Sequence, residues 1–160
     1  MKYKVKISTL QKEYPAKAFY EAIASSLSVE ESISLAGEDG IIETTLIGDV
    51  VKKNGLFILK YDECLEGMDG IHTLFKFPLD KPKEITIART GNARSMLFFE
   101  EGKYHISAYN AGVMSLEVGV YAIKIENTLL QDGFFEMNYI IDFNGLNTLN
   151  TTLRMEITKL

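Results

Sequence analysis

The sequence predicts a single, mostly β domain built as an antiparallel sandwich or an up-and-down barrel. Two observations predict it: apolar and polar residues alternate along most of the chain, and the alternating runs follow one another at short intervals. The 160 residues fit one domain that buries roughly 70% of its unfolded surface. A core of that size needs no covalent cross-link.

The first expected strand covers about residues 3–7, where Tyr3, Val5 and Ile7 share one face. Between about Pro15 and Leu27 the apolar period changes to that of an amphipathic helix. We therefore expect a helical insertion at about residues 11–28 that packs on the β structure or caps one end, the alternative being a recruitment helix for a partner. Further strands are predicted at about 29–36, 41–52, 56–64, 70–77, 83–90, 94–100, 103–110, 113–126, 133–143 and 147–159.

Three glycine positions predict details of the strand pairing. Asn54-Gly55 indicates a type I′ hairpin in which paired residue numbers sum to 109, which would lay Tyr61 over Gly48. Asn144-Gly145 should lie in a loop with an odd number of residues, because the inward candidates on both sides are odd-numbered. Gly119 marks a change of phase within one long strand and predicts a bulge or bend there.

Two charged residues occupy positions where apolar ones are expected. Glu63 ends the alternating run of Phe57, Leu59 and Tyr61, and Arg89 ends a similar run after Ile87. Alternate residues of a strand share a face, so both charges are predicted to point into the core. They could form a structural ion pair, or they could orient a ligand inside a cavity.

Composition excludes several classes of function. The 17 Lys and Arg residues against 22 Asp and Glu give a net charge of −5 without a basic cluster, which argues against nucleic-acid binding. The alternating N-terminus is unlike a signal peptide, and no apolar run is long enough for a membrane span.

With Cys64 as the single cysteine, a reducing compartment is favoured and cytoplasmic localisation is expected. We expect no metal and no cofactor, since His72 and His105 are isolated and no glycine-rich phosphate loop precedes a helix.

Catalysis has one candidate constellation. His105 shares a strand phase with Ser107 and Tyr109, and an inward His105 beside Glu63 would make acid–base chemistry possible. Cys64 lies on the phase opposite Glu63, and no motif brings a base to it.

Several short motifs follow one another between about residue 41 and the C-terminus: Tyr61-Asp62-Glu63, Arg89-Thr90-Gly91, the segment from Phe99 through His105 to Tyr109, and Gly112. Their order resembles that of the YwiB-like bacterial proteins, a family of unknown function with a calycin-like β-barrel fold. The helical stretch before residue 28 departs from that family, in which a short turn usually follows the first strand. The resemblance implies a closed barrel of about 8–10 strands and no known activity.

By analogy with such barrels, the leading prediction is non-catalytic binding of a small apolar or amphipathic molecule. Arg89 would anchor an acidic group, Glu63 would orient that arginine, and Tyr61, His105 and Tyr109 would supply polar contacts. The alternative is a protein-interaction or structural module with a filled barrel, possibly a homodimer. A second alternative is a hydrolase-like enzyme that uses His105 and Glu63.

Overall fold

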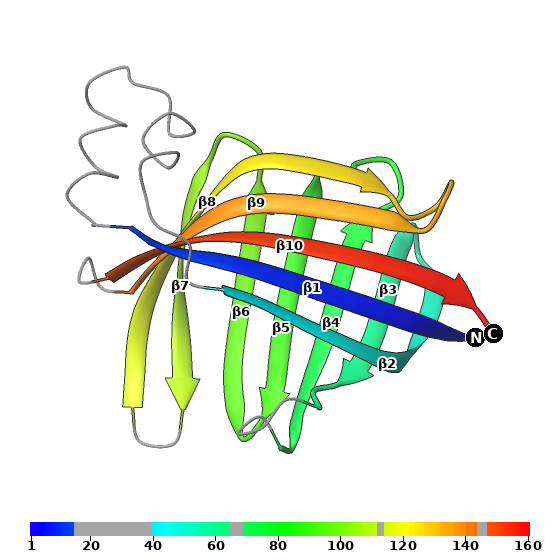
Figure 1. Cartoon of the computed structure of the whole chain (residues 1–160), viewed down its shortest axis with the longest axis horizontal. Coiled ribbons are helices and arrows are strands. Elements are labelled where there is room, and N and C mark those ends of the chain that lie inside the picture. Colours follow the sequence, from blue (N-terminus) through cyan, green and yellow to red (C-terminus); the bar gives the residue numbers. More distant parts are fainter. Residues whose placement is uncertain (15–39, 65–68, 112–113, 144–146) are drawn as a thin grey trace.

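Alternating residues form strands close to the predicted positions. The computed structural model describes residues 1–14, 40–64, 69–111, 114–143 and 147–160, which form a closed antiparallel barrel of ten strands (Figure 1). The predicted helix at Pro15–Leu27 and the predicted strand at 29–36 lie outside the described residues. The strands are β1 (Lys2–Tyr14), β2 (Gly40–Lys53), β3 (Leu56–Asp62), β4 (Ile71–Pro78), β5 (Glu84–Gly91), β6 (Ala93–Glu100), β7 (Tyr104–Ala111), β8 (Met114–Thr128), β9 (Phe134–Phe143) and β10 (Asn147–Lys159).

The topology is an up-and-down meander, as predicted. Each strand from β2 to β10 pairs with its neighbours in sequence, and β1 closes the ring by pairing with both β2 and β10. The two chain termini therefore meet at one end of the barrel (Figure 1). Among the described residues, no helix is long and apolar enough to cross a membrane.

Strand β1 extends further than the sequence indicates. The expectation that a helical stretch begins at about residue 11 is wrong for residues 11–14, which continue the strand. In this stretch β1 lies opposite β10, from Gln11–Thr151 to Tyr14–Thr148. The partner strand supplies the backbone hydrogen bonds that a helix would otherwise have provided, so pairing with the distant C-terminus overrides the local pattern.

The two predicted hairpin registers are confirmed. Val50 faces Leu59, so the numbers sum to 109, and Asn54 (φ 53°) and Gly55 (φ 75°) both have the positive φ of a type I′ turn. At the second hairpin, Phe143 faces Asn147, which leaves a loop of odd length between them.

Two glycine predictions are wrong in detail. Gly48 pairs with Tyr3 and is covered by Leu59, not Tyr61: a Cβ there would lie 2.7 Å from Leu59 Cδ1. The irregularity of β8 lies between Ala122 and Lys124 rather than at Gly119.

Gly119 has a different steric role. It is regularly paired, and a Cβ at this position would lie 2.0 Å from the Tyr104 hydroxyl oxygen. The glycine therefore makes room for the Tyr104 ring on the neighbouring strand.

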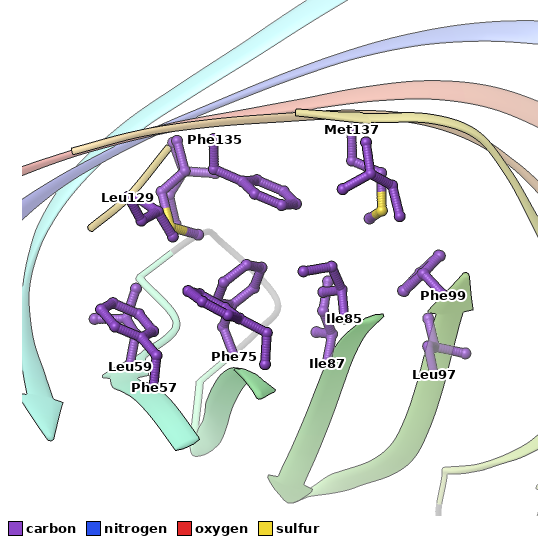
Figure 2. Packing of buried hydrophobic residues seen from close by; sticks show 14 of the residues in the cluster. Phe57, Leu59, Phe75, Ile85, Ile87, Leu97, Phe99, Leu129, Phe135 and Met137 are labelled. Atoms are coloured by element: carbon purple, nitrogen blue, oxygen red, sulfur yellow. The ribbon is translucent and has the colours of Figure 1, made fainter. Parts of the chain in front are cut away.

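The half of the barrel near the chain termini is filled with side chains. Phe57 and Phe77 stack with ring centroids 4.8 Å apart, and Phe75 meets the rings of Phe77 and Phe135 edge-on at 6.2 and 4.9 Å. Figure 2 shows Phe135 and Met137 of β9 pointing across the barrel toward side chains of the opposite wall. This aromatic cluster closes the barrel at one end, since every member is at most 1% exposed.

Candidate functional site

The other half of the barrel contains a cavity. Its volume is about 310 Å³, at the lower end of the range for small-molecule pockets. Phase alternation places inward residues from eight strands around it. The lining residues are Ile7, Thr9, Gln11, Ile42, Thr44, Tyr61, Glu63, Phe75, Ile87, Arg89, Leu97, Tyr139, Ile141, Phe143, Leu149, Leu153 and Met155.

A row of polar residues crosses one wall at the level of the cavity. Strand register places Tyr61 opposite Thr73, Thr73 opposite Arg89, Arg89 opposite Ser95, and Ser95 opposite Tyr109. Paired residues on antiparallel strands point to the same face, so this row follows from the register alone. One step deeper, the corresponding row is apolar and contains Leu59, Phe75, Ile87 and Leu97.

Glu63 and Arg89 form the charged centre of the site, as the alternation predicts. Glu63 Oε1 lies 3.6 Å from Arg89 Nε and accepts a hydrogen bond of 2.5 Å from the Thr73 hydroxyl. The Glu63 side chain is 7% exposed, whereas that of Arg89 remains 35% exposed. The carboxylate is thus fixed inside the wall, while the guanidinium is accessible.

The ion pair leaves hydrogen-bonding capacity on the arginine unused. Arg89 Nε is buried and has no hydrogen-bond partner, because its contact with Glu63 is too long. A guanidinium carries five N–H donors in a planar fork that suits a carboxylate or a phosphate. Arg89 is therefore equipped to bind an acidic group from the cavity.

Two tyrosines line the cavity, Tyr61 from the polar row and Tyr139 from β9. Burial, and secondarily the Glu63 charge, raises the pKa of Tyr61 far above its ordinary value of 10.0, against a smaller opposing effect of Arg89. Burial likewise raises the pKa of Tyr139, and the Arg89 charge and Thr151 oppose it. Both phenols remain neutral at physiological pH and keep a hydroxyl group for hydrogen bonding.

The opposite wall is mostly apolar. It is formed by β1, β9 and β10, which contribute Ile7, Ile141, Phe143, Leu149, Leu153 and Met155 beside the polar Thr9, Gln11 and Tyr139. The cavity consequently has a polar side with one cation and an apolar side facing it. Such a surface is complementary to an amphipathic molecule.

His105 does not join this site. Its ring meets Phe98 edge-on at 4.8 Å, and its Nε2 lies 3.1 Å from Glu100 Oε1 without hydrogen-bond geometry. A hydrogen bond from Lys103, with a lesser effect of the neighbouring His105, lowers the pKa of Glu100. The pairing of His105 with Glu63, on which the enzyme alternative depends, is therefore not formed. The carboxylate beside His105 is Glu100.

The position of His105 follows from the point at which strands β6 and β7 separate. β6 and β7 are paired only from Ala93–Ala111 to Ser95–Tyr109, and β7 then continues with β8 alone. Beyond the paired segment, alternation no longer determines which side chain on β6 lies near His105.

The remaining candidates lie at the edge of the site or outside it. Tyr109 belongs to the polar row but packs against the hydrophobic core and does not line the cavity. His72 is on the outer surface, with Nδ1 2.5 Å from Asp62 Oδ1. Cys64 is exposed, and its Sγ lies 3.2 Å from the Thr44 hydroxyl oxygen.

The sequence analysis did not single out Thr73, Ser95 or Tyr139 as site residues. The signal was available for the first two. Thr73 interrupts the apolar phase of Ile71 and Phe75 as Arg89 interrupts that of Ile87, and Ser95 does the same before Leu97. Each of these three residues is polar and stands at a position where the alternation predicts an inward side chain, and this feature indicates the site.

Comparisons with known proteins agree with this fold. Residues 27–155 match the family model described as a domain of unknown function (DUF1934). The crystal structure of the YwiB protein from Bacillus subtilis superposes with a TM-score of 0.63 at 16% sequence identity, covering 99% of this chain and 94% of that one. No curated protein sequence matches.

Proposed function

The chain belongs to the DUF1934 family, whose function is unknown, and from its own cavity we propose that it binds a small amphipathic acid without catalysing a reaction. One observation carries the proposal: Arg89, whose Nε has no hydrogen-bond partner, lines a cavity of about 310 Å³ whose opposite wall is mostly apolar. A charged arginine inside a barrel is costly unless it is hydrogen-bonded. An acidic ligand would supply the missing acceptor.

In this proposal Arg89 binds the acidic group, and Glu63, held by Thr73, keeps the guanidinium in place. Tyr61 and Tyr139 donate or accept hydrogen bonds at the polar end of the ligand. The apolar wall receives the remainder of the molecule. With one cysteine in the chain, we also propose that the protein works in a reducing compartment such as the cytoplasm.

A native mass spectrum of the protein, purified gently from its own host, tests the proposal. We expect an adduct of a few hundred daltons that disappears on denaturation. The Arg89→Met variant should lose this adduct. The matched control Arg94→Met, which removes an exposed arginine of the same hairpin, should keep it.

An adduct that persists in Arg89→Met would contradict the anchoring role of the arginine. A protein that is free of small molecules but forms a stable dimer or retains a second protein would favour the interaction module instead. The two outcomes have different masses and are separated in one spectrum.

A further inference from the structure

Building on the proposed function, we infer that the ligand is a compact monocarboxylic acid with an aromatic or branched body, bound across the barrel rather than along its axis. The alternative is a long-chain acid whose tail extends through the barrel. Four features of the described residues favour the compact acid.

The first feature is the closed floor of the cavity. Phe75 forms part of this floor, and beneath it lies the aromatic cluster of Phe57, Phe77 and Phe135. These rings are at most 1% exposed, so no space continues toward the chain termini. A long tail along the axis would have to displace closely packed rings, and protein cores resist such overpacking.

The second feature is the charge of the lining. Arg89 and Glu63 are the charged residues among the described residues that line the cavity. The Arg89 cation already lies beside one protein carboxylate, and its Nε without a hydrogen-bond partner leaves room for one further carboxylate. A second acidic group on the ligand would remain unpaired in a poorly solvated interior.

The third feature is the arrangement of the walls. Arg89 on β5 lies in the polar wall, whereas Leu149 and Leu153 on β10 belong to the apolar wall. A ligand that contacts both must span the width of the barrel. Because the two contacts lie across the barrel and not along its axis, the acidic group and the apolar body of the ligand must be joined by a short link, as in an arylacetic or branched-chain acid.

The fourth feature is the size and character of the space. A cavity of about 310 Å³ equals roughly ten water volumes in the liquid. Aromatic rings line it on several sides, from Tyr61, Phe75, Tyr139 and Phe143. Flat or branched bodies fill such a space with favourable ring contacts.

Isothermal titration calorimetry with the ligand-free protein tests this inference with three probes. Phenylacetate represents the compact acid, 2-phenylethanol is its neutral counterpart, and palmitate is the long-chain acid. We expect saturable one-to-one binding of phenylacetate. The neutral alcohol should bind about 10- to 100-fold more weakly, the range expected for losing hydrogen bonds to a charged group. Palmitate should show no saturable binding.

Two variants locate the binding. Arg89→Lys keeps the charge but loses the planar fork, so phenylacetate should bind about tenfold more weakly. Leu153→Phe reduces the space at the apolar wall and should abolish binding while the barrel remains folded by circular dichroism. Arg94→Met should bind phenylacetate as the unchanged protein does.

Each contrary result has a distinct meaning. Palmitate binding that depends on Arg89 overturns the compact-acid inference and leaves the proposed function intact. Phenylacetate binding that neither Arg89→Lys nor Leu153→Phe weakens overturns both. If none of the three probes binds, the compact acid is excluded, and the adduct in the native spectrum decides the proposed function separately.

Discussion

The two halves of this barrel are made by the same strands and differ in how the inward positions are filled. Toward the chain termini these positions hold Phe57, Leu59, Phe77 and Phe135, which are at most 1% exposed. Toward the other end the same strands carry Tyr61, Glu63, Arg89 and Tyr139 around a cavity. One barrel can thus contain both a filled core and a binding cavity. The boundary between the two lies where the inward residues of each strand change from large and apolar to polar.

The largest expected effect contrasts equivalent leucines in the two halves. Leu59→Ala removes a fully buried side chain from the filled half and should lower the free energy of unfolding by about 3–5 kcal/mol. Leu153→Ala enlarges a space that already exists, so its cost should be about 1 kcal/mol. Urea denaturation of both variants measures the difference. Equal costs would show that the second half is packed as tightly as the first.

The next effect concerns the charged centre. Arg89→Met leaves the nearly buried Glu63 carboxylate without its cation, and we expect a loss of about 2 kcal/mol, below the full cost of a broken buried pair because Arg89 is partly exposed. Adding Glu63→Gln should restore most of that stability. A double-mutant cycle by chemical denaturation gives the coupling. A coupling near zero would mean that the two residues fold independently.

A smaller effect is expected from the hydroxyl that holds Glu63. Thr73→Val preserves the shape of a buried β-branched residue and removes the hydrogen bond to the carboxylate. Stability should fall by about 1.5 kcal/mol, the lower limit for a hydrogen bond to a charged group. The control is Ser95→Ala, which removes a hydroxyl group from the same polar row, at the position opposite Arg89. Thermal denaturation of both variants measures the difference.

The smallest effect concerns Tyr61, whose contribution to stability changes only at alkaline pH. Because the folded protein raises the pKa of Tyr61 above 10.0, the unfolded chain loses this proton first as the pH rises. The contribution of Tyr61 is complete below pH 10 and is lost above it. Tyr61→Phe should therefore lose less stability than the unchanged protein between pH 9 and pH 11 in denaturant titrations. Parallel curves for the two proteins would contradict the shift.

The sequence was sufficient for the parts of the fold that depend on local alternation. It predicted nine of the strands closely, the register at Asn54-Gly55, and the inward direction of Glu63 and Arg89. It did not predict that β1 continues to Tyr14, because that extension depends on pairing with β10 at the other end of the chain. Long-range pairing of this kind leaves little trace in a local pattern.

The candidate site was predictable to a smaller extent. Polar residues on inward phases identify the Glu63–Arg89 pair and its row, including Thr73. The neighbour of His105 was not predictable, since it depends on where β6 and β7 part. Whether the barrel is hollow depends on the summed volumes of side chains from many strands, and no single strand contains that information.

The closure of the barrel by β1 and β10 constrains when the protein can fold during synthesis. The pairs run from Tyr3–Lys159 to Tyr14–Thr148, so the first strand of the barrel receives one of its two neighbours from the last strand of the barrel. Until β10 has been synthesised, β1 presents an open edge, and edges of this kind are prone to pair with other chains. Such high contact order delays closure of the barrel until β10 is available. A truncated chain that lacks β10 should therefore remain an open, aggregation-prone sheet.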